Sequence, residues 1–131
     1  MGNEELLFTD EKWRDIVGYN GKYQVSNYGR VRNNKQLLFK PYSNSCGYLR
    51  VGLRRNGVLH REFVHRLVAE AFINNPYNLP VVNHKNEDKE DNRVVNLEWL
   101  SISDNLNYGT LQERKRSSLK ATLKRKAINL F

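Results

Sequence analysis

Residues 81–106, which read VVNHKNEDKEDNRVVNLEWLSISDNL, decide the fold class. Two short apolar runs, the second at Val94–Leu100, enclose a polar stretch, so they predict two strands joined by a long loop. Ser101 and Asp104 have the spacing of an N-terminal capping box, which predicts a helix directly after the second strand. Asn105 would be the fourth residue of that helix. This stretch therefore predicts a strand–loop–strand–helix unit.

The residues before this unit predict β-structure followed by one short helix. Between residues 13 and 31, β-favouring residues are interrupted by turn signals. Asn56-Gly57 is a strong hairpin signal, and the alternating residues before it would pair with a partner strand at 58–63. Over residues 65–72, apolar side chains recur four positions apart, which predicts an amphipathic helix. We therefore expect an α+β fold.

Composition excludes several classes of protein. A chain of 131 residues suits one domain, or a small domain with an appendage. Its one cysteine, Cys46, excludes an internal disulfide and a zinc site built on cysteines. No apolar run approaches the roughly 18 residues of a membrane span, and the N-terminus lacks the layout of a signal peptide. We expect a soluble intracellular protein.

The net charge of +8 is unevenly distributed along the chain. Residues 12–66 hold twelve basic and two acidic side chains, whereas residues 67–110 hold three basic and seven acidic ones. Residues 111–131 are basic again, with seven basic side chains against one acidic. The two basic segments could bind a polyanion on both sides of a site that attracts a cation. A solvated surface of uneven charge is the simpler interpretation and stays open.

The polar residues of the 81–106 unit suit the hydrolysis of a phosphodiester. His84 is the residue type whose pKa suits a general base near neutral pH. Asparagine carbonyl oxygens can bind a hard cation such as Mg²⁺, and Asn83 and Asn105 could face one ion from two sides. Alternation along the strand would send His84 to the side opposite Asn83, toward an attacking water.

The same stretch resembles the HNH endonucleases of phages and introns, whose ββα-metal motif holds one divalent ion. The segments that carry this resemblance are VHRLVA (64–69), VVNH (81–84), DNR (91–93), NLEW (96–99) and SDN (103–105). The chain also resembles the NUMOD-type β module that precedes HNH in those enzymes, at WRDI (13–16), YQVSN (23–27), GRVR (29–32) and GYL (47–49). Together the resemblance covers residues 11 to 107.

The resemblance implies four parts: an arm over residues 1–10, a NUMOD-type β-rich DNA-binding module over 11–62, a ββα-metal (His-Me finger) nuclease domain over 63–109, and a basic C-terminal helix over 110–131. It implies an endonuclease that cuts or nicks double-stranded DNA with one divalent metal ion, Mg²⁺ or Mn²⁺. We expect a monomer or weak dimer, of phage origin and present in the cytoplasm of a bacterial host cell.

The resemblance also implies roles for single residues. His84 would be the general base, Asn83 and Asn105 the metal ligands, and Asn96 the residue that braces the loop within the catalytic set. His65 is expected to pack or cap the helix that it opens. Basic side chains would bind DNA phosphates, which positions the protein without specifying sequence. These DNA-binding candidates are Arg30, Arg32, Arg54, Arg55, Arg66, Arg114, Lys115, Arg116 and Lys124.

Two features depart from the family pattern. Relatives often carry an aspartate where this chain has Asn83, so the lower negative charge predicts weaker metal affinity. Longer relatives add a helix-turn-helix reader, whereas this sequence ends after one basic helix, which predicts modest sequence specificity or a shortened chain. Two alternatives therefore stay open: an HNH-fold DNA-binding protein with weak or no catalysis, and an interaction protein that inhibits a phage or host factor.

Overall fold

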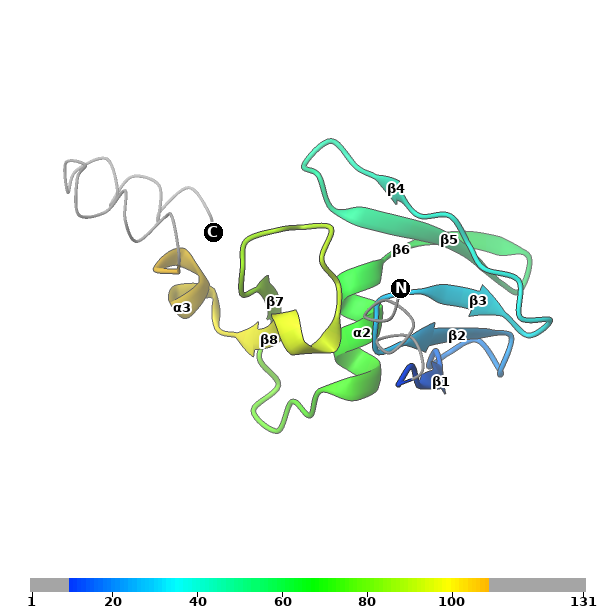
Figure 1. Ribbon diagram of the computed structural model, residues 1–131, viewed down its shortest axis with the longest axis horizontal. Coiled ribbons are helices and arrows are strands. Elements are labelled where there is room, and N and C mark those ends of the chain that lie inside the picture. Colours follow the sequence, from blue (N-terminus) through cyan, green and yellow to red (C-terminus); the bar gives the residue numbers. More distant parts are fainter. Residues whose placement is uncertain (1–9, 109–131) are drawn as a thin grey trace.

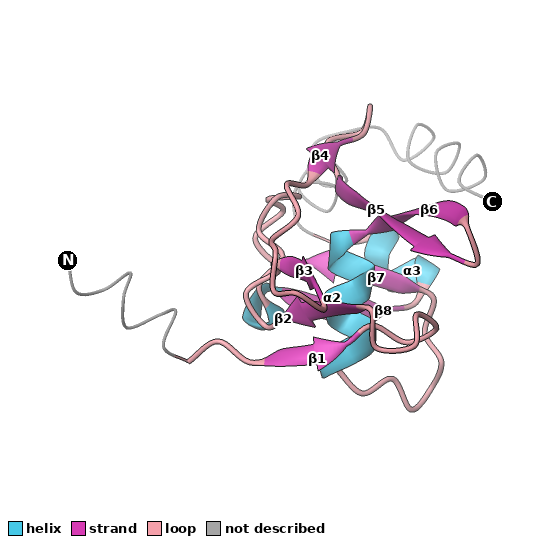
Figure 2. Ribbon diagram, turned by 90° about the vertical axis from the view of Figure 1, so that its right-hand side faces the viewer, coloured by secondary structure: helices cyan, strands magenta, loops and turns pink. Residues whose placement is uncertain are grey.

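The computed structural model describes residues 10–108 of the chain. Three small antiparallel sheets surround the helix α2 (Val64–Phe72), as Figure 1 and the turned view in Figure 2 show. The basic helix predicted over residues 110–131, and all of the predicted arm except its last residue, lie outside the described part. None of the helices in that part combines the length and the hydrophobicity that a membrane span needs.

The first sheet confirms the β-structure predicted for the N-terminal region. Its strands are β1 (Trp13–Asp15), β2 (Tyr23–Ser26) and β3 (Val31–Asn33), paired antiparallel in chain order. Gly29 takes a left-handed conformation (φ +85°) in the turn between β2 and β3, which a residue with a Cβ adopts only with strain. The turn lets β3 return beside β2.

The second sheet contains β4 (Tyr42–Ser43), β5 (Leu49–Arg55) and β6 (Val58–Phe63). The predicted hairpin between β5 and β6 is confirmed: Asn56 and Gly57 both have positive φ, as a type I′ turn requires. The short strand β4 was not predicted. β6 ends at the residue before α2 begins, so the hairpin runs into the helix without a linker.

The third sheet is the predicted strand–loop–strand, followed by its helix. β7 (Val81–His84) pairs with β8 (Leu97–Leu100), and α3 (Ile102–Leu106) follows. The prediction of a strand over Val94–Leu100 was partly wrong, because its first half is the 3-10 turn η1 (Val94–Asn96). The reason is the length of the partner: β7 ends at the residue that pairs with Leu97, so the earlier residues have no strand opposite them.

The helix α3 begins as the sequence predicted, with one difference. The Ser101 hydroxyl accepts a hydrogen bond from the backbone N–H of Asp104 at 3.0 Å, and Asn105 is the fourth helical residue. Within the described residues, the Asp104 carboxylate makes no return bond to the Ser101 N–H. The cap is therefore one half of a capping box.

One hydrophobic core runs through all three sheets. Its members come from both sides of the boundary expected between residues 62 and 63, so the two predicted modules share a single interior. Trp99 on β8 adds a tie, because its indole N–H donates to the carbonyl of Ile73 at 3.1 Å. The buried core residues are Ile16, Tyr19, Val25, Val31, Val51, Leu53, Val64, Leu67, Val68, Ala69, Val82 and Leu97.

Candidate functional site

The alternation of β7 separates Asn83 from His84. Val82 and His84 are buried on the core side of the hairpin, whereas Val81 and Asn83 are half-buried on the other side. Figure 1 shows α2 on one side of the β7–β8 hairpin and α3, which carries Asn105, on the other. Asn83 is thus on the α3 side and His84 on the α2 side.

Asn83 lies directly opposite Glu98 in the β7–β8 ladder. Its Nδ2 donates a hydrogen bond to Glu98 Oε2 at 2.9 Å. Within the described part, the Asn83 Oδ1 and the side-chain amide of Asn105 make no hydrogen bond, so both remain available as ligands. An amide oxygen is a ligand that Mg²⁺ or Mn²⁺ accepts.

A metal site here would use amide oxygens as ligands and not only carboxylates, imidazoles or thiolates. Among residues 10–108, no group of three or more His, Cys, Asp and Glu side chains could hold a metal ion. The site would rest on the amide oxygens of Asn83 and Asn105, with Glu98 as the adjacent negative charge. The residues present therefore fit a hard divalent cation.

His84 is held by one hydrogen bond on the buried side of the hairpin. His84 is 5% exposed, and its Nε2 lies 2.7 Å from Asn92 Oδ1. An amide oxygen only accepts, so in this arrangement Nε2 carries the proton and Nδ1 keeps a lone pair. Nδ1 makes no hydrogen bond within the described residues, and it is not fully enclosed by the protein. It is the basic atom of the ring.

Two aromatic rings form the wall behind His84. The ring centroid of His65, on α2, lies 5.0 Å from that of His84, and the centroid of Tyr48 lies 6.0 Å away. Burial, with the neighbouring His84 and Arg66 acting in the same direction, lowers the pKa of His65 to about 4. His65 is therefore neutral near pH 7 and packs against the site, which agrees with the packing role expected from the sequence.

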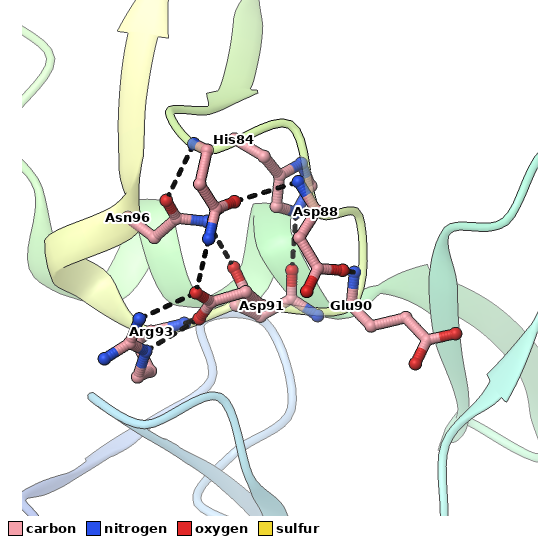
Figure 3. A network of polar contacts seen from close by, with 8 residues as sticks. His84, Asp88, Glu90, Asp91, Arg93 and Asn96 are labelled. Atoms are coloured by element: carbon pink, nitrogen blue, oxygen red, sulfur yellow. Dashed lines mark hydrogen bonds and ion pairs between the residues drawn. The ribbon is translucent and has the colours of Figure 1, made fainter.

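Asn96 connects the two ends of the loop between β7 and β8 (Figure 3). Its Oδ1 accepts from the Asn86 N–H at 3.0 Å, and its Nδ2 donates to Asn86 Oδ1 at 2.9 Å and to the Asp91 carbonyl at 2.8 Å. Its own carbonyl accepts from the Lys85 N–H at 2.7 Å. With 6% of its surface exposed, Asn96 satisfies loop backbone groups from the interior.

The acidic side chains of the loop differ in their surroundings. Asp91 accepts two hydrogen bonds from the Arg93 guanidinium, both at 2.7 Å, and a third from Asn86 at 2.9 Å (Figure 3). The bonds from Arg93 lower the pKa of Asp91 to about 2, against an opposing effect of burial. Asp88 and Glu90 are exposed. Asp91 is a structural part of the loop.

The arginines expected to bind DNA on the first sheet are engaged within the protein. Arg30 donates to both carboxylate oxygens of Glu11, so its charge is paired. Arg32 stacks on Trp13, with its guanidinium carbon 3.9 Å from the ring centroid, and donates to Gln24 at 2.8 Å.

The other arginines in the described part have different surroundings. Arg54 and Arg55, at the end of β5, lie against carbonyl oxygens and an aromatic ring, and within residues 10–108 no carboxylate pairs with either. Arg66 on α2 donates to the Pro80 carbonyl at 3.0 Å and lies 3.9 Å from the Glu70 carboxylate. The remaining candidates, Arg114, Lys115, Arg116 and Lys124, lie outside the described residues.

Three residues that line this site were not predicted from the sequence. Asn92 and Glu98 belong to the segments DNR and NLEW that carried the resemblance, but no role was assigned to them. If the two strands are aligned antiparallel from Val81 and Leu100, Asn83 pairs with Glu98. The sequence therefore contained a signal for that contact. Tyr48 reaches the site from the second sheet, and no local pattern indicated it.

Comparison with known proteins places this geometry in a family. The NUMOD4 motif matches residues 11–54, and the HNH endonuclease family matches residues 62–107. The uncharacterized HNH endonucleases L245 and L247 of Acanthamoeba polyphaga mimivirus are each 38% identical to this chain, over 80% and 95% of its length. The chain spans about a third of those two relatives, 32% and 33% of their lengths.

A phage relative matches over more of its own length. The DNA endonuclease I-HmuI of Bacillus phage SP01 is 35% identical over 89% of this chain and 70% of the relative. A solved structure described as DNA binding and cleavage by the HNH homing endonuclease I-HmuI superposes with a TM-score of 0.71, covering 88% of this chain and 64% of that one. This chain therefore belongs to the HNH homing endonuclease family, with a NUMOD4 motif before its HNH region.

Proposed function

We propose that this protein is a metal-dependent DNA endonuclease that hydrolyses one phosphodiester strand at a time, and so nicks double-stranded DNA. The observation that carries the proposal is the ββα unit itself. Asn83 and His84 are the last two residues of β7, and Asn105 is on the helix across the hairpin, with ligand atoms left unbonded within the described part. Membership of the HNH homing endonuclease family supports the same activity.

The proposed role of His84 follows from its hydrogen bond. Asn92 accepts at Nε2, so Nδ1 has the lone pair that can take a proton from an attacking water. The ring is held between this bond and the neutral side chain of His65, which restricts its orientation. His84 would therefore act as the general base.

Asn83 and Asn105 are the proposed ligands of one divalent ion, Mg²⁺ or Mn²⁺. When bound, such an ion stabilises negative charge on the phosphate and on the leaving oxygen. The bond from Asn83 Nδ2 to Glu98 directs the opposite atom of the amide, Oδ1, away from that carboxylate. Asn96 would keep the loop in place without touching the reacting groups.

The proposed substrate is duplex DNA, bound through arginines of the β-rich region and through the basic segment from 111 to 131. In that case residues 11–62 form the DNA-binding module and residues 63–109 the nuclease domain. One ββα site handles one strand, so a monomer would nick and a double-strand break would need two events. The proposed setting is the cytoplasm of a phage-infected bacterium.

Plasmid relaxation by purified protein tests the proposal. Supercoiled DNA should become nicked circles with Mg²⁺ or Mn²⁺ and stay supercoiled with EDTA. His84→Ala should reduce the rate by about 10²–10⁴-fold and leave DNA affinity unchanged. His60→Ala is the matched control, because His60 is on the β5–β6 hairpin and contacts Tyr19 instead of the site.

Three outcomes separate this proposal from its rivals. Equal cleavage by His84→Ala and the wild-type protein would overturn the assignment of the base. Failure with every divalent ion, together with salt-sensitive DNA binding, would indicate an HNH-fold DNA-binding protein without catalysis. If the wild-type protein neither cleaves nor binds DNA, that outcome would indicate an interaction protein.

A further inference from the structure

We propose that Asn92 positions the His84 ring, and that the β2–β3 turn of the N-terminal region in turn fixes Asn92. The inference rests on the proposed function, because it adds a positioning residue to a general base. Asn92 is 4% exposed, and its Oδ1 lies 2.7 Å from His84 Nε2. An acceptor fixed at Nε2 holds the proton on that nitrogen and keeps the lone pair on Nδ1.

The polar group of Asn92 has no other use within the described residues. Its Nδ2 is buried there without a hydrogen-bond partner, which costs stability. If Asn92 served only to pack the loop, an apolar side chain of similar size would avoid that cost. The single side-chain hydrogen bond of Asn92 in this part of the chain is the one to His84, so orienting the ring accounts for the amide.

The β2–β3 turn lies in direct contact with Asn92. A Cβ built on Gly29 would lie 3.0 Å from the Asn92 Cβ and 3.0 Å from the Asn92 carbonyl oxygen. Two residues from this contact on each segment, the Val94 N–H donates to the Asn27 carbonyl at 2.9 Å. The turn therefore contacts the loop at Asn92 and Val94, and a side chain at position 29 would push Asn92.

The turn is itself held by its own hydrogen bonds. The Ser26 hydroxyl accepts from the backbone N–H groups of Tyr28 and Arg30 at 3.2 and 3.1 Å. Ser26 is fully buried, so this support is anchored in the shared core. The region that matches the NUMOD4 motif thus has a second role besides binding DNA: it sets the position of the catalytic ring through one glycine and one asparagine.

Two glycine variants test the role of the turn. Gly29→Ala and Gly21→Ala both place a Cβ on a left-handed residue (φ +85° and +76°), but a Cβ at Gly21 has nothing within 4 Å. Both should lose stability in thermal unfolding, and Gly29→Ala should lose more than Gly21→Ala because its new Cβ also presses on Asn92. Only Gly29→Ala should lower kcat for plasmid nicking, by about 10-fold or more, with KM for DNA unchanged, because a misplaced base slows chemistry without weakening binding.

Two variants of Asn92 test the hydrogen bond. Asn92→Leu removes the acceptor and should lower kcat by about 10²-fold with unchanged KM. Asn92→Asp keeps an acceptor at the same place and should restore much of that loss. If Asn92 served only to pack the loop, the apolar side chain in Asn92→Leu should leave kcat unchanged. That result would overturn the proposal.

A spectroscopic readout keeps the inference separate from the proposed activity. In metal-free protein above pH 7.5, ¹⁵N shifts of the His84 ring should report a single Nε2–H tautomer, and Asn92→Leu should give a mixture. An Nδ1–H tautomer in the wild-type protein, or equal kcat for Gly29→Ala and Gly21→Ala, would overturn the inference. A protein that cleaves no DNA but shows the fixed tautomer would overturn the proposed function and leave the positioning role supported.

Discussion

The side-chain amide of Asn83 donates a hydrogen bond to the carboxylate of Glu98, 2.9 Å away across the β7–β8 ladder. The family resemblance leads us to expect an aspartate where this chain has Asn83, so the proposed metal site would take its negative charge from Glu98 on the facing strand instead. The amide also suits this place in the absence of a metal ion, because two carboxylates at this distance would repel each other. This pair allows a test that separates metal binding from folding.

Asn83→Asp should have opposite effects on the metal-free and metal-bound protein. Without metal, the new carboxylate faces Glu98, so the melting temperature should fall. With Mg²⁺, the added charge should strengthen binding, so the rise in melting temperature should exceed that of the wild-type protein, and half-maximal cleavage should need less Mg²⁺. Thermal unfolding with EDTA and across a Mg²⁺ titration measures both effects.

The control for this variant is Asn34→Asp, which makes the same charge change at an exposed position between β3 and β4. Its response to Mg²⁺ should match that of the wild-type protein. A metal-free Asn83→Asp protein as stable as the wild-type one would show that the contact with Glu98 does not persist in solution.

Asn105→Ala should raise the Mg²⁺ concentration needed for half-maximal cleavage, because it removes one proposed ligand. Replacing Mg²⁺ with Mn²⁺ should recover part of the rate, since oxygen and nitrogen sites bind Mn²⁺ more tightly. The cap of α3 is made by Ser101, so the helix should still form. A defect that no metal concentration relieves would argue that Asn105 acts on folding and not as a ligand.

Asp91 should make stability depend on acid pH. Its pKa is lowered to about 2 by hydrogen bonds from Arg93, so the unfolded chain binds the extra proton between pH 4 and 2. The stabilisation is complete above about pH 4 and is lost as pH falls toward 2. Asp91→Asn should therefore lower the free energy of unfolding by about 1–2 kcal/mol at pH 7, by a difference that shrinks below pH 4.

Urea unfolding at several pH values measures this dependence. Glu90→Gln is the matched control, because Glu90 is an exposed acid in the same loop. A difference between Asp91→Asn and the wild-type protein that stays constant from pH 7 to pH 3 would show that the ion pair with Arg93 does not cause it.

The arginines of the β-rich region should differ in their contribution to DNA binding. Arg54→Gln should flatten the log–log dependence of affinity on salt by about 0.9, the value for one lost phosphate contact. Arg30→Gln should change the slope less, because Glu11 already pairs with that guanidinium. Fluorescence anisotropy of a labelled duplex at several salt concentrations gives the slopes; equal slopes for both variants would contradict the effect of Glu11.

The sequence predicted the elements that depend on local patterns. The Asn56-Gly57 turn, the helix before residue 73 and the Ser101 cap each require only residues close together in the chain, and each is confirmed. The strand over Val94–Leu100 was predicted too long, because its length is set by where β7 ends and not by its own apolar residues.

The candidate site shows the same limit. Strand alternation was enough to put Asn83 and His84 on opposite sides of the hairpin. The partner of His84 could not be predicted this way, because Asn92 reaches it through the fold of the loop, eight residues away. Tyr48 comes from another sheet altogether, and only the packed core brings it to the ring.

The junction between β6 and α2 has a consequence for how the molecule could measure distance along DNA. Phe63 ends β6 and Val64 begins α2, so no linker separates the β-rich region from α2, and the shared core packs the β7–β8 hairpin that carries His84 against that helix. If arginines such as Arg54 bind the DNA backbone, the distance between that contact and the cleaved bond is fixed by the fold and not by a flexible linker. The cleavage position would then be a fixed offset, and exchanging one half of this protein for that of a relative would require cutting through its interior.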